Sequence, residues 1–165
     1  MGERRQFLAV LASACGLAPL VAWLASPSAG DAMADEFRIQ KSDDDWRRTL
    51  TTAQYQVLRH HSTERAGTSP LNHEEREGTF QCAGCGHPLF DAETKFESGT
   101  GWPSFWRPLD GAVGTKVDRS WLTVRIEVHC AECGGHLGHV FNDGPGPTGL
   151  RYCMNGVALN FKPRA

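Results

Sequence analysis

Two pairs of cysteines, each with the spacing Cys-x-x-Cys, constrain the fold of this chain more than any other feature. CAGC covers Cys82–Cys85 and CAEC covers Cys130–Cys133, and a glycine follows each pair. Two thiolates at this spacing can bind one ion, and two such pairs complete a tetrahedral sulfur site of the kind that suits zinc. Because residues 86–129 separate the pairs, the ion would join two distant hairpins. A site closed by four sulfurs leaves no position for a substrate, so we predict one structural zinc ion.

The four cysteines also have other conceivable uses. In an oxidising compartment they could form disulfides, and a single pair could be a redox-active dithiol. His136 or His139 could instead join a mixed coordination shell. Four sulfurs already complete the shell of a zinc ion, so we leave both histidines unligated.

The first 34 residues are typical of an export signal. Arg4-Arg5 precedes an apolar run from Phe7 to Leu24, and residues 32–34, Ala-Met-Ala, offer a cleavage site. RRQFL resembles a twin-arginine signal, whose export machinery carries folded proteins, so metal could be loaded in the reducing cytosol. We expect a periplasmic or exported protein. The alternative is an uncleaved segment that anchors the chain to the inner membrane, since the run is close to the minimum length for spanning a bilayer.

Residues 35–165 are predicted to form a single domain, and Cys15 would be lost with the signal. The chain carries a formal net charge of −2, which gives no electrostatic basis for a nucleic-acid partner. Its 18 glycines and 9 prolines favour a loop-rich or β-rich fold over a helical bundle.

Short helices are expected before the first cysteine pair. Three aspartates, Asp43–Asp45, favour the positive end of a helix dipole. A second helix should begin at Thr51, with Gln54 as its capping-box partner. His60 and His61 fall at the end of this helix and are interpreted as solvent-exposed, and residues 62–78 as a loop.

Strand signals follow. Residues 121–128 alternate, with Leu122, Val124, Ile126 and Val128 on one face, and Val157, Leu159 and Phe161 repeat the pattern. Residues 91–95 and 109–118 are predicted to be turns and connections.

A lone cysteine remains once the signal and the metal ligands are set aside. Cys153 lies between Arg151 and Asn155, and all three share one face if the segment is extended. A cation beside a thiol favours the thiolate, the attacking form. His136 and His139 follow the second cysteine pair, and Asp143 is placed to orient an imidazole. An inert buried cysteine is the plainer interpretation, but this combination favours a nucleophile with a base.

Several longer motifs then resemble a known family. In chain order, GWPSF, HLGHVFNDGP and RYCMN, together with the two cysteine pairs, are similar to the B-type methionine-R-sulfoxide reductases from about Trp46 to Phe161. The resemblance implies a compact, mainly antiparallel β fold of the β-tent type, with short N-terminal helices and a zinc site made of four cysteines. It further implies Cys153 as the catalytic cysteine and Trp102 as the residue that accepts the S-methyl group. The remaining implied positions bind or polarise the sulfoxide and activate the thiol: His136, His139, Asp143, Arg151 and Asn155.

The same resemblance implies reactants and partners. The substrate is methionine sulfoxide, free or within proteins and peptides, and the reductant is an external thiol such as a thioredoxin-like protein. Many members carry a resolving cysteine where this chain has Thr100, so we expect a one-cysteine cycle. The protein is expected to be a monomer, and its signal to be recognised by the twin-arginine machinery.

Two other function classes remain open at this point. A zinc-ribbon binding module would need a basic or aromatic strip, which the near-neutral charge does not provide. A metal-dependent hydrolase using His136, His139 and Asp143 would need an open metal position.

Overall fold

The computed structural model describes residues 37–120 and 123–165, all of which belong to one compact unit, Asp35–Ala165. The predicted signal, Met1–Ala34, lies outside the described residues. In the described part of the chain, no helix has the length and apolar character needed to cross a bilayer.

Two short α-helices open the described chain, as predicted. In α1, Asp43–Thr49, the side chain of Ser42 caps the N-terminus and three aspartates occupy the first turn. In α2, Thr52–His60, Thr51 is the N-cap, and both bonds of the capping box with Gln54 are present. Each helix satisfies its first free N–H groups locally, which is why short segments can hold helical geometry here.

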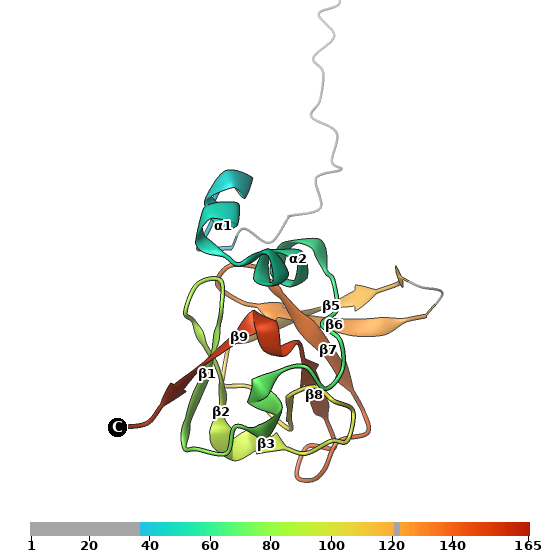
Figure 1. The fold of residues 1–165 in the computed structure, drawn as a ribbon. Coiled ribbons are helices and arrows are strands. Elements are labelled where there is room, and N and C mark those ends of the chain that lie inside the picture. Colours follow the sequence, from blue (N-terminus) through green and yellow to red (C-terminus); the bar gives the residue numbers. More distant parts are fainter. Residues whose placement is uncertain (1–36, 121–122) are drawn as a thin grey trace, which may run out of the picture. The chain divides into compact units, whose positions relative to one another are not determined.

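The rest of the described chain is mainly β, and its strands are antiparallel. A three-stranded sheet has the order β2-β1-β9, and a six-stranded sheet has the order β3-β4-β8-β7-β6-β5 (Figure 1). The strands are β1 Gly78–Cys82, β2 Pro88–Asp91, β3 Lys95–Phe96, β4 Ser104–Phe105, β5 Val113–Asp118, β6 Arg125–Cys130, β7 His136–Phe141, β8 Arg151–Met154 and β9 Leu159–Pro163. Short 3-10 turns intervene at η1 Pro70–His73, η2 Ala92–Thr94 and η4 Gly156–Ala158. The mainly β, antiparallel fold class with two short helices is confirmed.

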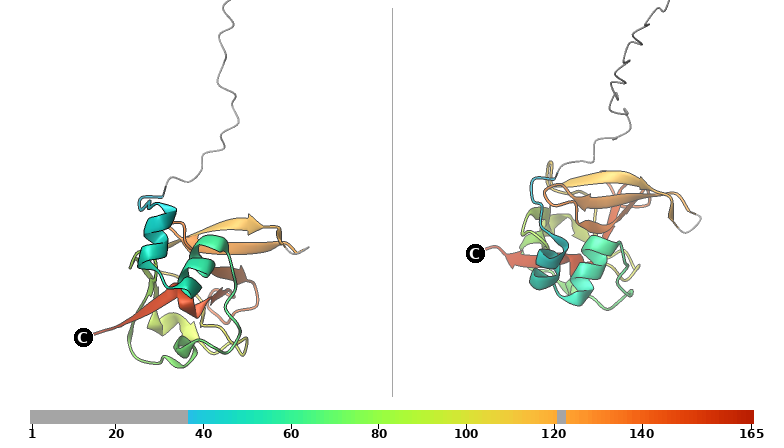
Figure 2. Two further views of the ribbon diagram at one scale, coloured as in Figure 1. Left: turned by 45° about the horizontal axis from the view of Figure 1, so that its top comes forward. Right: turned by 90° about the horizontal axis from the view of Figure 1, so that it is seen from above.

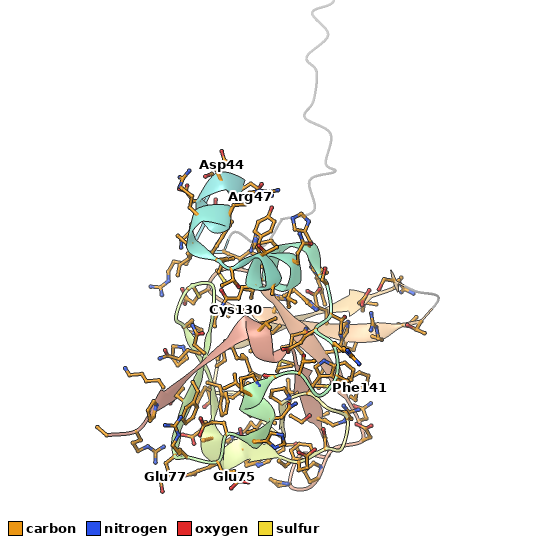
Figure 3. The ribbon with its side chains drawn as sticks, in the orientation of Figure 1. Asp44, Arg47, Glu75, Glu77, Cys130 and Phe141 are labelled. Atoms are coloured by element: carbon orange, nitrogen blue, oxygen red, sulfur yellow. The ribbon has the colours of Figure 1, made fainter. Side chains whose placement is uncertain are left out.

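An aromatic cluster fills the space between the two sheets. Phe80 of β1 and Phe90 of β2 both contact Phe105 of β4, with ring centroids 4.9 and 4.3 Å apart. All three side chains are fully buried. Burying three phenylalanine rings contributes several kcal/mol, and their stacked and edge-on contacts fix how one sheet lies on the other. Charged side chains such as Asp44, Arg47, Glu75 and Glu77 lie at the periphery (Figure 3).

Three of the sequence-based element predictions were wrong in detail. Residues 109–118 are not only a connection, because they contain β5, which forms a long hairpin with β6 (Figure 2). As an edge strand, β5 carries no buried apolar row, so it has no period-two hydrophobic signal. Of the strand predicted over 121–128, residues 121 and 122 lie outside the described residues, β6 begins at Arg125, and Val124 and Ile126 of the apolar face are exposed. Val157 belongs to η4, and β9 begins two residues later, at Leu159.

Strand β6 buries an acidic side chain. Glu127 is 2% exposed, although it alternates with the predicted apolar face of this strand. A buried carboxylate must be compensated by partners, and those partners belong to the site described next.

Candidate functional site

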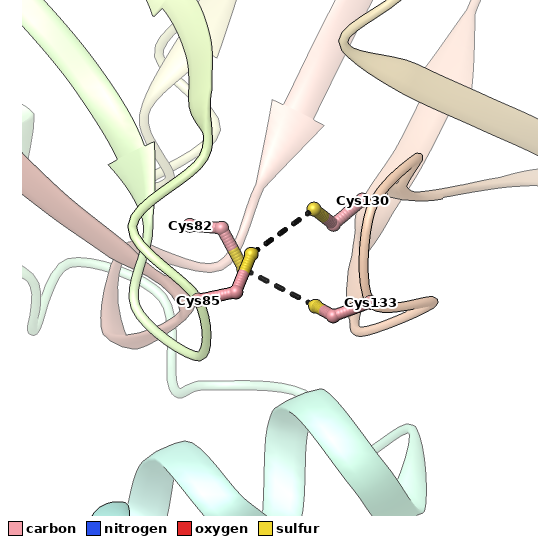
Figure 4. Close-up of side chains that lie close together, drawn as sticks. All are labelled: Cys82, Cys85, Cys130 and Cys133. Atoms are coloured by element: carbon pink, nitrogen blue, oxygen red, sulfur yellow. Dashed lines mark hydrogen bonds between the residues drawn. The ribbon is translucent and has the colours of Figure 1, made fainter. Parts of the chain in front are cut away.

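The four cysteines of the two Cys-x-x-Cys pairs, here called the knuckle cysteines, converge on one point (Figure 4). Cys82 Sγ lies 3.7 Å from Cys133 Sγ, and Cys85 Sγ lies 3.6 Å from Cys130 Sγ. A tetrahedral zinc ion with Zn–S bonds of about 2.3 Å holds its sulfurs about 3.8 Å apart. A disulfide would need a separation of about 2.05 Å. The four free thiols therefore fit one tetrahedral metal ion and are too far apart to be disulfides.

The cysteine cluster joins the two sheets. Cys82 ends β1 of the three-stranded sheet, and Cys130 ends β6 of the six-stranded sheet. Each pair turns in the same way: Gly86 N–H donates to Cys82 O at 2.8 Å, and Gly134 N–H donates to Cys130 O at 2.9 Å. A metal bound here would cross-link strands that no backbone ladder connects.

A second cluster lies along one row of the six-stranded sheet. Five adjacent strands each contribute one residue to this row, and each residue is paired with the next across the sheet. In order they are Lys116 of β5, Glu127 of β6, His139 of β7, Cys153 of β8 and Ser104 of β4. Residues directly opposite on antiparallel strands point to the same face, with Cβ atoms about 5 Å apart. The register therefore sets the Cys153 side chain beside that of His139.

A bulge in β7 brings His136 to the same face as His139. Val128 pairs with Gly138 and His129 pairs with His136, so Leu137 is an extra residue on β7. Residues three apart on a regular strand point to opposite faces, whereas one extra residue restores the same face. The rings of His136 and His139 are 5.5 Å apart between centroids, edge to face.

Gly138, between the two histidines, allows β7 and β8 to approach closely. A Cβ atom at this position would lie 2.1 Å from Cys153 O. No side chain fits there without moving the backbone of the strand that carries Cys153. The glycine of HLGH is thus needed for close strand approach.

Cys153 borders a small pocket of about 100 Å³. The pocket is lined by Thr63, Trp102, Gly138, His139, Cys153 and Asn155. Thr100 Oγ1 lies 3.8 Å from Cys153 Sγ. The indole of Trp102 donates from Nε1 to Glu64 O at 2.9 Å, which fixes the ring at the pocket wall. The structure therefore brings Cys153, His139, Asn155 and Trp102 to one place.

The carboxylate beside His139 is Asp118, and not Asp143 as predicted. His139 Nε2 is 2.8 Å from Asp118 Oδ2. Hydrogen bonds from Ser120 and His139 keep the pKa of Asp118 well below its usual range, so Asp118 is an acceptor and Nε2 carries the proton. The Nδ1 atom is then the nitrogen at which His139 can take up or release a proton. Burial lowers the pKa of His139 and outweighs the opposing bond from Asp118.

Asp143 has a different partner. Both of its oxygens accept from Arg151, at 2.9 and 2.8 Å, in a two-bond pair. Asp143 is the largest influence that raises the pKa of Arg151, and the neighbouring Cys153 adds to it. The guanidinium also lies over the Phe141 ring, 4.4 Å from its centroid. Asp143 thus orients a cation beside the thiol rather than an imidazole.

The side chain of Asn155 is used as a brace. Its Nδ2 donates to Leu137 O at 3.0 Å, and its Oδ1 accepts from Glu64 N at 2.8 Å. Glu64 in turn accepts from Trp102 and, through Oε2, from Val157 N. Asn155 and Glu64 together hold β7, the Trp102 loop and η4 around the pocket.

Sequence reasoning missed three residues of this region: Asp118, Glu127 and Glu64. Burial by itself opposes the ionisation of Glu127, but bonds from His136, His61 and Lys116 outweigh it and hold the pKa of Glu127 below its usual range. His61, interpreted as a solvated helix end, contacts this buried carboxylate at 3.1 Å.

The missed contacts are distant in the chain. Asp118 and His139 are 21 positions apart, and Glu64 and Val157 are 93 positions apart. No local pattern of residues could therefore have indicated them.

Fold and site together define a mainly β protein with a four-cysteine metal-type cluster and a separate thiol–histidine pocket. The model of the SelR domain matches residues 50–163, which shows that the chain belongs to the SelR-domain family. It is 52% identical to a Leptospira interrogans protein named peptide methionine sulfoxide reductase MsrB, over 76% of this chain and 97% of the relative. Proteins of the same name from Pseudomonas putida (strain W619) and Methanosarcina barkeri are 54% and 52% identical, over 77% and 75% of this chain and 96% and 88% of theirs.

Proposed function

We propose that this protein reduces methionine-R-sulfoxide, free or within proteins, to methionine. The observation that carries the proposal is the placement of Cys153 directly opposite His139, with Trp102 on the wall of the same pocket. Membership of the SelR-domain family and relatives named methionine sulfoxide reductases support it. A hydrolase mechanism at His136, His139 and Asp143 has less support, because Asp143 pairs with Arg151 and not with either histidine.

The chemistry follows from the pocket residues. The Cys153 thiolate attacks the sulfoxide sulfur, and His139 supplies a proton to the oxygen from Nδ1. The protonated oxygen then moves from the substrate sulfur to Cys153 Sγ as the sulfur–sulfur bond breaks, so methionine leaves as the thioether and Cys153 becomes a sulfenic acid. The indole face of Trp102 offers an apolar surface to the S-methyl group, and Arg151, held by Asp143, places a positive charge near the thiol. His136 lies beside His139 but does not line this pocket.

The sulfoxide epimer is the direct test of this proposal. With dithiothreitol as reductant, we expect the protein to convert the R epimer of a dabsylated methionine sulfoxide and to leave the S epimer unreacted. The readout is chiral separation of the remaining sulfoxide. Equal consumption of both epimers, or of S alone, would remove the proposal.

We also propose that the four-cysteine cluster holds one structural zinc ion. The sulfur spacing fits a tetrahedral ion, and four thiolates are a donor set that zinc favours. Bound zinc would clamp β1 to β6, and the catalytic steps would not pass through it. Cys153 is not one of the four.

Asp118 is proposed to position His139. In Asp118→Asn we expect kcat/KM to fall by about 10²-fold, the lower end of general acid–base contributions. The bond from Asp118 raises the pKa of His139, so its removal should move the histidine limb of the pH–rate profile to lower pH. Asp143→Asn is the matched control, since it perturbs Arg151 and should leave that limb in place. If only the control moves the limb, the assignment to Asp118 is wrong.

The recycling step is proposed to need an external thiol, with thioredoxin-like proteins as the chemical class. Thr100, within 3.8 Å of Cys153, occupies the position where a resolving cysteine would be useful. Peptide mapping after one turnover should find no intramolecular disulfide to Cys153 in the parent. In Thr100→Cys we expect a disulfide between positions 100 and 153, because the side chains are already adjacent. A Cys153 disulfide to any knuckle cysteine in the parent would contradict the one-cysteine cycle.

Residues 1–34 are proposed to be a cleaved twin-arginine signal of a periplasmic, monomeric enzyme, with an uncleaved membrane anchor as the alternative. The Arg4-Arg5 pair and the apolar run support this. Intact mass of the exported protein decides between the two, because an anchor would retain the first 34 residues.

A further inference from the structure

A second group of metal-type ligands lies on the far side of His139 from Cys153. His61 Nδ1 is 3.1 Å, and His136 Nδ1 is 2.7 Å, from the same carboxylate oxygen, Glu127 Oε1. The three side chains come from the end of α2, from β7 and from β6. Their ligand atoms all lie within 4.8 Å of one another.

The donor set and its spacing suit a transition metal. Two imidazoles and one carboxylate form a common catalytic zinc shell, with metal–ligand bonds of about 2.0–2.2 Å that place neighbouring donors about 3.3–3.6 Å apart. The observed separations from Glu127 Oε1, 3.1 and 2.7 Å, are hydrogen-bond distances, so the side chains must part by less than about 1 Å to admit the ion. Neutral imidazoles need only carry their proton on Nε2 to present Nδ1 to a metal, so no extra proton has to be lost.

The surroundings favour an exchangeable site rather than a permanent one. Glu127 and His136 are buried, whereas the His61 side chain is 50% exposed. All three line a cavity of about 740 Å³ that also reaches Asp118 and His139. Water can therefore reach the coordination positions that the protein does not fill. Lys116 Nζ, 3.0 Å from Glu127 Oε2, neutralises part of the carboxylate charge and must weaken cation binding.

We propose that His61, Glu127 and His136 form a second site for a divalent transition metal ion, distinct from the four-cysteine cluster. A bound ion would coordinate His136 Nδ1 and would replace the hydrogen bond between His136 and Glu127. Because the His136 ring lies against His139, the ion would also perturb the pocket of Cys153. We therefore expect the ion to inhibit sulfoxide reduction. Only this consequence rests on the proposed function.

Zn²⁺ is the probe, because an exchange of metal at the four-cysteine cluster would only replace one zinc ion by another. Full-length protein loaded with one zinc is titrated calorimetrically with Zn²⁺, in a background with Cys15→Ser and Cys153→Ser that removes both thiols outside the cluster as ligands. We expect one further equivalent to bind. His61→Asn should weaken this second event by at least about tenfold, as expected for loss of one of three ligands. Asparagine is chosen because His61 has φ of 55°, which asparagine tolerates.

The neighbouring histidine supplies the matched control. His60 packs edge-on against Tyr55, with centroids 4.8 Å apart, and contributes no ligand to the group. His60→Asn should therefore bind the second zinc as the parent does, and Lys116→Gln should bind it several-fold more tightly by removing a repulsive charge. No second equivalent in the parent, an unchanged affinity in His61→Asn, or an equal loss in His60→Asn would each overturn the site. Calorimetry does not use the sulfoxide reaction, so its outcome is independent of the proposed activity.

Discussion

Cys153→Ser is expected to abolish sulfoxide reduction, with kcat/KM falling by at least about 10³-fold. A serine hydroxyl stays protonated at neutral pH and cannot pass through a sulfenic acid, so both the attack and the oxygen transfer are lost. The side chain is half-buried and differs by one atom, so the free energy of unfolding should change by less than about 1 kcal/mol.

Two measurements make this prediction specific. Activity is followed with dithiothreitol, which bypasses any need for a natural reductant, and thermal unfolding is followed on the same samples. We expect an inactive protein that melts with the parent and retains its zinc. Turnover at the parental rate in Cys153→Ser would falsify the mechanism, whatever the family.

Cys130→Ser should instead destabilise the fold strongly. Cys130 is fully buried at the end of β6 and lies 3.6 Å from Cys85 Sγ. Structural zinc sites contribute about 10–16 kcal/mol in small peptides, which exceeds or equals the whole stability of a typical domain. Removing one of four ligands should cost at least about 4 kcal/mol, or roughly 15 °C in Tm.

The matched control is again Cys153→Ser, since it removes a thiol that is not part of the cluster. Metal analysis of purified protein should give one zinc per chain in the parent and in Cys153→Ser, and much less in Cys130→Ser. Equal zinc content and equal Tm in all three proteins would show that the cluster is not a structural metal site.

Local signals predicted the local features well. The capping box at Thr51 and Gln54 formed because both bonds lie within four residues. Each cysteine pair forms the tight local turn that its spacing predicts, and the four sulfurs lie where one tetrahedral ion could bind. Predictions of burial failed where long-range packing overrides the alternation of apolar and polar residues along a strand. Glu127 sits on the polar face of its strand yet is buried, because that face turns toward His136, His61 and Lys116.

The sequence by itself determined the chemistry that is available: a lone Cys153, two knuckles, two histidines and a tryptophan loop. Only the tertiary structure decided how they are used. Strand register sets Cys153 opposite His139, and the bulge at Leu137 turns His136 to the same face. The tertiary structure also pairs Asp118 with His139, and Asp143 with Arg151, through side-chain hydrogen bonds. These pairings depend on which strands lie side by side, and that is settled by burial of the phenylalanine core and by backbone ladders between segments far apart in the chain.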